Sequence, residues 1–296
     1  MWMRLGAVLA ACFFAISAWA AEPEGRTDAS LPTFRVTAAE IHVTFTAAQA
    51  KNLPVTDLTA GDIQIMRDGR VVDDVVSFEP YTDTALSALV MVDVSDSMTS
   101  ALPLERAASE WLAASSDASR DQLSFVNFGD EVQSDKGLTS RRHVTSLYDA
   151  LMDSMPTFAR NSSGRKSLIL LTDGIDNYSL HSLNDVIAAA QRYDIAVYAI
   201  TAHPGKNQYF RTDVLTKLCE ETGGRYFEVR KADAMLSAMA KINEELRNGY
   251  EVVFRPGSAG AGMHQLAIRG TQRQLKFFHR AAYFQPAAVG EAMASR

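Results

Sequence analysis

The sequence predicts an α/β protein: a doubly wound, mainly parallel sheet with helices on both faces, and a small antiparallel β-sandwich built from both ends of the chain. Two observations carry this prediction. The middle of the chain alternates short apolar runs with amphipathic helical patterns, as a parallel sheet covered on both faces does. Both flanks instead alternate polar and apolar residues, which is typical of antiparallel strands with one buried face.

The first 20 residues predict a signal peptide. Arg4 precedes an apolar stretch over residues 5–16, and Ala18-Trp19-Ala20 forms a small-x-small cleavage site, so we expect cleavage after Ala20. The segment Leu9-Ala10-Ala11-Cys12 also fits a lipoprotein signal, in which Cys12 would become the lipidated first residue. The hydrophobic sequence after Cys12 favours the first interpretation, and the protein is then expected in the periplasm or outside the cell.

Charge and composition exclude several classes of protein. Removal of Arg4 with the signal leaves 28 of the 29 basic residues against 35 acidic ones, so the net charge moves from −6 to −7, which argues against nucleic acid as a partner. No run after the signal approaches the roughly 20 apolar residues of a membrane-spanning helix. The mature chain keeps one cysteine, Cys219, at helical spacing from Leu215, and we expect it to be a small buried hydrophobe without a disulfide partner.

The two flanks indicate one β domain. Residues 21–32 are mainly polar, with Pro and Gly, and predict a flexible leader. Residues 33–80 alternate in polarity and contain Asp68-Gly69, a hairpin turn signal. Alternation returns over residues 249–285, after a helix stop at Asn248-Gly249, and residues 286–296 form a tail. We therefore expect both stretches to share a β-sandwich, with residues 86–247 inserted as the α/β domain.

Five strands and four helices are expected in the α/β domain. The strand candidates are Ala88–Val92, Leu123–Phe128, Leu168–Thr172, Ile195–Thr201 and Tyr226–Val229. Apolar residues at i, i+3, i+4 and i+7 predict helices over Leu104–Leu112, Leu183–Ala190, Val214–Leu218 and Ala232–Leu246.

Oxygen-bearing side chains follow two of these strands. Asp93-Val94-Ser95-Asp96-Ser97 comes directly after the first apolar run, and Thr172-Asp173-Gly174 follows a later one. A third segment, from Val144 to Ala150, places Thr145 ahead of Leu-Tyr-Asp-Ala. Ligands of open α/β sheets collect outside the carboxyl ends of the strands, and Mg²⁺ or Ca²⁺ prefers oxygen ligands. These segments therefore indicate a metal site.

These motifs resemble the von Willebrand factor A (VWA) family. Asp93-x-Ser95-x-Ser97, Thr145, the Thr172-Asp173-Gly174 turn and Thr222-Gly223-Gly224 occur in the family's order, and the resemblance covers nearly all of the mature chain. The flanking segment Val55-x-x-Leu58-Thr59 resembles the leader of secreted bacterial VWA-related proteins of the type described from Acidobacteria.

The resemblance implies a VWA (Rossmann-like) fold with a metal-ion-dependent adhesion site. It implies that Ser95, Ser97 and Thr145 supply neutral hydroxyl ligands, and that Asp93 and Asp173 supply charge directly or through water. The expected cation is Mg²⁺, with Mn²⁺ or Ca²⁺ as alternatives. A first shell poor in anions should bind a further carboxylate, which in this family comes from an Asp or Glu of a protein partner. No catalytic residue is expected.

Two positions depart from the family pattern. Asp96 stands where a glycine is usual between the serines, and it could add a carboxylate beside the metal or point into water. Asp tolerates a left-handed backbone better than most residues, so the turn is expected to survive. His143-Val144 replaces a second glycine ahead of Thr145, which changes the expected shape of that loop.

Other interpretations remain open. Taken singly, Ser95, Ser97 and Thr145 could be helix caps, and Asp173-Gly174 could be a turn. A phosphatase of the haloacid dehalogenase type would need Asp-x-Asp, but Ser95 occupies the second acidic position. Neither a nucleophile elbow, a Walker loop nor a His-Glu-x-x-His helix occurs. A structural scaffold with a vestigial metal site is the main alternative to adhesion.

Overall fold

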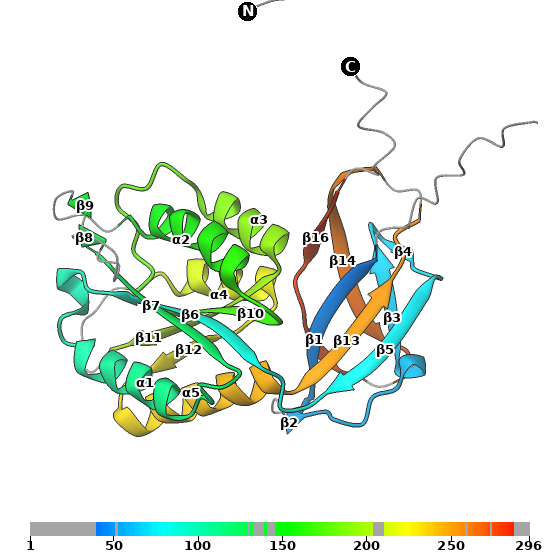
Figure 1. The fold of residues 1–296 in the computed structure, drawn as a ribbon, viewed down its shortest axis with the longest axis horizontal. Helices are drawn as coiled ribbons and strands as arrows, with labels where there is room; N and C mark the ends of the chain where they lie inside the picture. Colours follow the sequence, from blue (N-terminus) through cyan, green and yellow to red (C-terminus); the bar gives the residue numbers. More distant parts are fainter. Residues whose placement is uncertain are drawn as a thin grey trace, which may run out of the picture. The chain divides into compact units, whose positions relative to one another are not determined.

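The computed structural model describes residues 40–50, 53–129, 131–132, 139–140, 146–203, 210–257, 260–272 and 274–286 (Figure 1). All of them belong to one compact unit. The predicted signal peptide, the leader, Cys12, Thr145 and all but the first residue of the predicted tail lie outside the described residues. Within the described part, no helix is long and apolar enough to cross a membrane.

The middle of the chain forms a five-stranded sheet whose pairings are all parallel. The strand order is β12-β11-β10-β6-β7. After β6 the chain adds β7 on one side, and it then crosses to the other side of β6 for β10, β11 and β12. The direction of winding therefore reverses between β6 and β10, and ligands of doubly wound sheets bind at such a switch point. The strands are β6 (Leu86–Asp93), β7 (Gln122–Phe128), β10 (Arg165–Leu171), β11 (Ile195–Ala202) and β12 (Tyr226–Val229).

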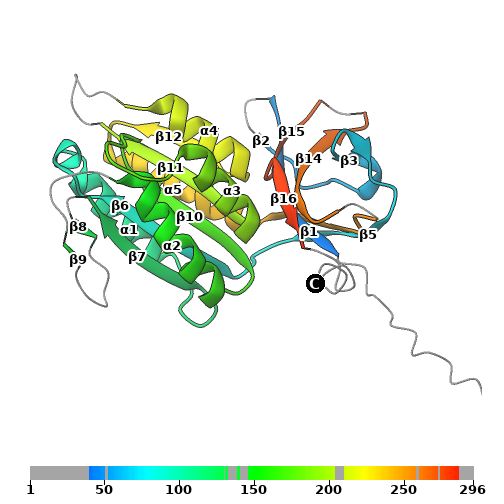
Figure 2. The same ribbon diagram turned by 90° about the horizontal axis from the view of Figure 1, so that it is seen from above.

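Helices cover both faces of this sheet, which confirms the predicted fold class. Figure 1 shows α2, α3 and α4 on one face and α1 and α5 on the other, and Figure 2 shows the first three side by side across the sheet. Alternate residues of β6 point to opposite faces of the sheet. Leu89 and Met91 pack in the core with α2, α3 and α4, and Ala88 and Val90 pack in the core with α1 and α5. The helices are α1 (Leu102–Ala114), α2 (Leu147–Asn161), α3 (Leu183–Tyr193), α4 (Thr212–Thr222) and α5 (Ala232–Arg247).

One helix and one pair of short strands in the α/β part are absent from the sequence-based prediction. Helix α2 buries Leu147, Leu151 and Met155 at helical spacing, but Pro156 lies inside it and interrupts the helical pattern of the sequence. A short antiparallel pair, β8 (Glu131–Val132) and β9 (Thr139–Ser140), follows β7. Cys219 is fully buried, and burial raises the pKa of its thiol, as expected for an inert core residue.

Strands from the two flanks pair with each other. One sheet has the order β15-β1-β13-β5, with β2 beside β1, and a second has the order β16-β14-β3-β4. The strands of the first flank are β1 (Ile41–Gln49), β2 (Leu53–Pro54), β3 (Ile63–Arg67), β4 (Arg70–Val71) and β5 (Val75–Tyr81). Those of the second flank are β13 (Gly249–Phe254), β14 (Gly262–Gly270), β15 (Lys276–Phe278) and β16 (Ala282–Gln285). A shared core joins both flanks, and Phe45 and Phe78 each stack on Tyr250 within it.

The predicted hairpin turn at Asp68-Gly69 is present between β3 and β4. Arg67 pairs with Arg70, so the loop has two residues, and Asp68 and Gly69 have φ angles of 49° and 77°. Positive φ at both positions is the geometry of the turns that match the twist of a hairpin.

A buried ion pair ties the ends of the α/β segment together. The Asp121 carboxylate lies 2.7 Å from the Arg247 guanidinium, and their side chains are 1% and 10% exposed. The backbone N–H of Leu86 donates to the same carboxylate at 2.9 Å. Burial raises the pKa of Asp121, but these hydrogen bonds outweigh burial and lower the pKa to about 2.

We expect Asp121→Ala to lower the free energy of unfolding by about 3 kcal/mol, because it leaves the Arg247 guanidinium buried without its carboxylate. Urea denaturation at pH 7 measures this change. Because the pKa of Asp121 in the folded protein is below its unfolded value, the pair stabilises the wild type above about pH 4 and is lost as the pH falls toward 2. Glu110→Gln, which breaks an exposed pair with Arg106 on α1, is the control and should cost less than about 0.5 kcal/mol.

Candidate metal centre

The polar motifs converge at the switch point of the parallel sheet. Val92 at the end of β6 pairs with Leu171 at the end of β10. The residues that follow, Asp93 and Thr172, are therefore neighbours at the carboxyl edge of the sheet. Asp173 comes next in the chain, and the loop with Ser95 and Ser97 leaves β6 at the same edge.

Asp93 is fully buried and held through both carboxylate oxygens. The Thr172 hydroxyl donates to Asp93 Oδ2 at 2.6 Å, and the backbone N–H of Ser95 donates to Asp93 Oδ1 at 3.0 Å. Burial raises the pKa of this carboxyl group, while the hydrogen bonds act in the opposite direction. Thr172 was not assigned a role from the sequence, since a threonine at a strand end carries no signal of its own.

Ser95, Ser97 and Asp173 form a chain of oxygen atoms. The hydroxyl oxygens of Ser95 and Ser97 lie 3.1 Å apart, and the Ser97 hydroxyl donates to Asp173 Oδ2 at 2.7 Å. The other oxygen of Asp173 accepts from the backbone N–H of Ile175 at 2.9 Å. Both ends of the chain, Ser95 and Asp173, are buried, and Ser97 between them is exposed, so the chain reaches the surface at Ser97.

These spacings fit a small octahedral cation. Two ligands at right angles, each about 2.1 Å from Mg²⁺, lie about 3 Å from each other. The separations of 3.1 Å between the serine oxygens and 2.7 Å between Ser97 and Asp173 both agree with this value. The oxygen atoms are also of the hard type that Mg²⁺, Mn²⁺ and Ca²⁺ prefer. The described residues therefore fit the predicted metal.

The structure brings together four of the five predicted ligands: Asp93, Ser95, Ser97 and Asp173. The fifth, Thr145, lies outside the described residues and stays a prediction, as does the shape of its loop. Asp96 is exposed and begins a short 3₁₀ helix (Asp96–Met98), and it does not have a positive φ angle. The turn at Asp96 therefore forms without a left-handed backbone, because it continues toward α1 through helical geometry.

The loop after Asp173 is fixed by two carboxylates. Asp149 in the first turn of α2 accepts from the backbone N–H groups of Leu180 and His181 and lies 2.7 Å from the His181 ring nitrogen. Asp176 accepts from the Ser179 hydroxyl at 2.6 Å. The His181 side chain is exposed, and it is paired with Asp149. This loop is therefore held against α2, the helix that follows Thr145.

One buried acidic residue near the site was not predicted. Glu105 in α1 is 0% exposed, and burial, followed by the charges of Asp93 and Asp173, raises its pKa to about 9. The apolar stripe predicted for α1 includes Ala108 and Leu112, which are buried, but it did not include Glu105, which is buried beside them.

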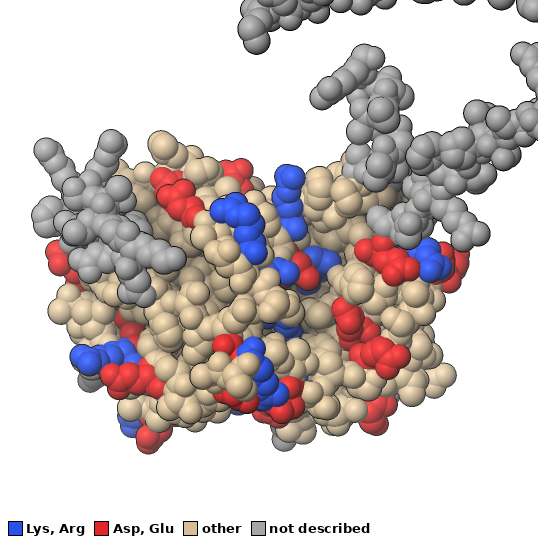
Figure 3. Space-filling view, in the orientation of Figure 1, with Lys and Arg blue, Asp and Glu red and all other residues tan. Residues whose placement is uncertain are grey.

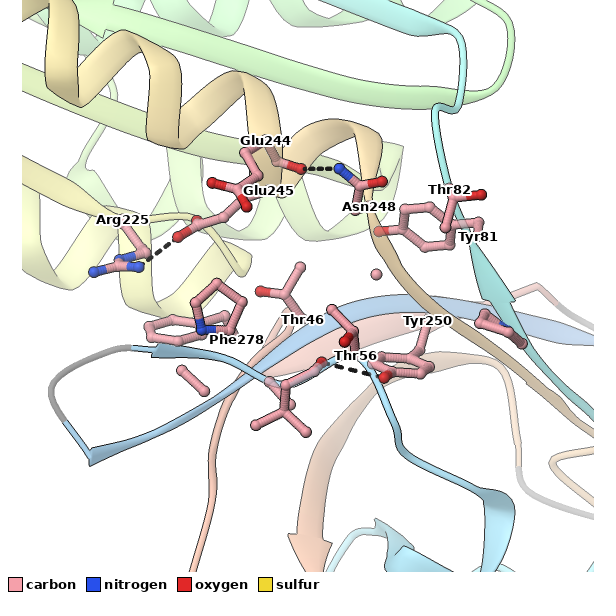
Figure 4. Close-up of a pocket in the computed structure, with 16 residues that line it drawn as sticks. Thr46, Thr56, Tyr81, Thr82, Arg225, Glu244, Glu245, Asn248, Tyr250 and Phe278 are labelled. Atoms are coloured by element: carbon pink, nitrogen blue, oxygen red, sulfur yellow. Dashed lines mark hydrogen bonds and ion pairs between the residues drawn. The ribbon is translucent and has the colours of Figure 1, made fainter.

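A separate cavity of about 140 Å³ lies where α5 meets the flanking strands (Figure 4). Arg225 and Glu245 form an ion pair on one side of it, and Tyr250 donates to the backbone carbonyl of Val55 at 3.1 Å on the other. None of the four described metal-site residues lines this cavity. Figure 3 shows acidic and basic side chains interspersed on the face in view, which is unlike the basic face of nucleic-acid-binding proteins.

Residues 151–244 match the family model described as the von Willebrand factor type A domain. The match runs from α2 into α5 and includes Asp173, and it begins after the segment from Asp93 to Ser97. The comparison with curated proteins found no match.

Several solved structures are similar to the chain. Proximal thread matrix protein 1 from the mussel byssus, with a zinc-occupied MIDAS motif, has 16% sequence identity and a TM-score of 0.48, covering 60% of this chain and 50% of that one. A von Willebrand factor type A structure from Catenulispora acidiphila has 11% identity and a TM-score of 0.45, covering 76% of this chain and 75% of that one. The chain spans about half the length of the mussel protein.

Proposed function

Because the chain contains a von Willebrand factor type A domain, we propose that it is an exported protein-binding module. In this proposal a divalent cation at the switch point captures an Asp or Glu carboxylate of a partner protein. The cation is Mg²⁺, with Mn²⁺ or Ca²⁺ as alternatives. Its ligands are Ser95, Ser97 and Thr145, with Asp93 and Asp173 binding directly or through water. The proposal includes no catalytic step.

The convergence of Asp93, Ser95, Ser97 and Asp173 is the observation that carries this proposal. Two of these residues follow β6 by a few positions, and Asp173 comes about 80 residues later, yet one hydrogen-bond chain joins them. Helix capping by Ser95 or Ser97 would not require this, and neither side chain caps the 3₁₀ helix or α1. A shared ion explains all four positions at once.

The charges and exposure of these residues support capture of an outside carboxylate. The two carboxylates are buried, and the exposed member of the oxygen chain is Ser97, which carries a neutral hydroxyl. A divalent cation held mostly by hydroxyls keeps much of its positive charge, and Mg²⁺ retains exchangeable water positions. A partner's carboxylate would therefore meet a positive ion from the solvent side.

The surface next to the site supports a protein as the partner. On the loop after Asp173, Tyr178 is 68% exposed and Leu180 is 94% exposed. Val94, between Asp93 and Ser95, is also exposed. Tyrosine and apolar side chains are frequent in the centres of protein interfaces. Because Asp149 fixes the backbone of Leu180, this apolar contact is preorganised, which lowers the entropy lost on binding.

We expect the mature chain, residues 21–296, to retain partner proteins from an envelope extract of its source organism in Mg²⁺ and to lose them in a chelator. The physical reason is that the cation supplies the contact with the partner's carboxylate. An affinity pull-down followed by mass spectrometry measures this difference.

Asp93→Ala is the matched variant in the same pull-down, and it should retain none of the chelator-sensitive proteins. Circular dichroism confirms that the variant is folded. Recovery of the same proteins from wild type and variant, with and without chelator, would favour the metal-independent scaffold instead.

A further inference from the structure

Glu105 is a fully buried acidic side chain with no hydrogen-bond partner for either carboxyl oxygen among the described residues. A buried polar group without a partner destabilises a protein, and a carboxyl group does so more than most. A leucine at this position would fill similar space without that cost. The acidic side chain therefore needs a hydrogen-bond partner other than the described residues.

The local structure places Glu105 close to the metal centre. Successive backbone bonds lead from the site into α1: Met98 N–H donates to the Ser95 carbonyl, Ala101 N–H to Met98, and Glu105 N–H to Ala101. Glu105 thus lies in the first turns of α1, immediately after the loop that carries the two serines.

The orientation of Glu105 is set by its neighbours on the helix. Ala101, Ala108 and Leu112, at spacings of −4, +3 and +7, belong to the core between α1 and the sheet. Glu105 therefore faces the sheet at the end where α1 begins, which is the carboxyl edge of β6. The charges of Asp93 and Asp173 both act on it, which agrees with this position.

We propose that Glu105 is a third carboxyl group of the metal centre, which holds the cation's bound water from the α1 side. The inference rests on the proposed function, since it requires a cation at the same site. The bound water gives the buried oxygens of Glu105 the hydrogen-bond donors that the described residues do not. The acidic group in turn strengthens a site whose other contacts are mainly neutral hydroxyls.

Titration calorimetry with MgCl2 tests this role on the mature protein and on Glu105→Gln. We expect the variant to bind Mg²⁺ at least about 10-fold more weakly, the effect typical of groups that orient a metal's ligands through hydrogen bonds. Glu110→Gln, on the exposed side of the same helix, should bind with wild-type affinity.

Glu105→Leu separates metal binding from folding. In a chelator this variant should unfold at the same urea concentration as the wild type or a higher one, because it removes the unpartnered carboxyl group. In excess Mg²⁺ the wild type should gain stability and Glu105→Leu should gain less. A structural role alone would change the urea midpoint in chelator and leave the Mg²⁺ affinity unchanged.

The results distinguish this inference from the proposed function. If the wild type binds Mg²⁺ and Glu105→Gln binds it equally well, the role of Glu105 is wrong and the metal centre stands. If the wild type takes up neither Mg²⁺, Mn²⁺ nor Ca²⁺, both proposals are wrong.

Discussion

Asp173→Asn is expected to weaken Mg²⁺ binding by more than about 100-fold. The amide keeps the size of the side chain and one acceptor oxygen, which can accept from Ser97 or from the backbone N–H of Ile175 but not from both. The variant loses the negative charge of Asp173. The hydroxyls of Ser95 and Ser97 are neutral, so they cannot replace the attraction between that charge and a hard cation. The loss of Mg²⁺ affinity should exceed the 10- to 100-fold that is typical when a group that hydrogen-bonds to a metal ligand is removed.

Isothermal titration calorimetry with MgCl2 measures this change. Asp153→Asn is the control, because Asp153 is exposed on α2 and is not among the predicted ligands. An Asp173→Asn variant that binds Mg²⁺ as the wild type does would show that the cation is held elsewhere.

Gly224→Ala is expected to lower the free energy of unfolding by more than about 4 kcal/mol, which would leave little stability in a typical domain. A Cβ atom on Gly224 would lie 2.0 Å from the Val197 carbonyl oxygen and 2.5 Å from its carbon. These are backbone atoms of β11, which pairs on both sides, so they cannot move away. Urea or thermal denaturation of the purified protein measures the loss.

Gly61→Ala is the matched control for this prediction. Gly61 has no positive φ angle, and a Cβ atom there would lie 3.8 Å from the nearest atom, the Thr59 hydroxyl, which is an ordinary contact. The control should change stability by less than about 1 kcal/mol. Equal stability of Gly224→Ala and the wild type would mean that α4 and β11 do not approach as closely as described.

The Thr222-Gly223-Gly224 motif illustrates what the sequence could reveal. The motif occurs in the family's order, but the sequence did not show which contact requires these residues. In the structure Gly223 ends α4 with a φ of 87°, Thr222 accepts from the backbone N–H of Val197, and Gly224 lies against Val197. The motif therefore marks the close approach of a helix end to a central strand, which depends on tertiary structure and not on local pattern.

The strands of the parallel sheet were predictable because buried strands read as continuous apolar runs. Their ends differ from the predicted ones by at most three residues, as at Arg165, where polar residues begin a strand. Helix α2 was harder, because Pro156 breaks the pattern of apolar residues without breaking the helix. Packing of Leu151 and Met155 against the sheet outweighs the lost hydrogen bond.

The convergence of polar residues at the candidate site was predictable where they follow strands, and not where they lie within helices. Asp93 and Asp173 stand at strand ends, so the parallel topology brings them together. Glu105 belongs to a helix, and only the rotation of α1 about its axis decides whether it faces water or the sheet. That rotation depends on how Met98 and Ala101 pack. The spacing of apolar residues defines the buried side of a helix only to within about one residue, so it does not show whether Glu105 is buried.

The pairing of β1 with β13 has a consequence for the order of folding. Ile41 pairs with Phe254, and the whole α/β segment lies between them in the chain. Contacts between residues so distant in sequence form slowly, because closing the loop costs entropy before any contact compensates for it. Once the intervening segment has folded, its two ends are adjacent, since the N–H of Thr84 donates to the carbonyl of Arg247 at 3.0 Å. We therefore expect the α/β segment to fold first and to shorten this loop, and the outer sheets to close last.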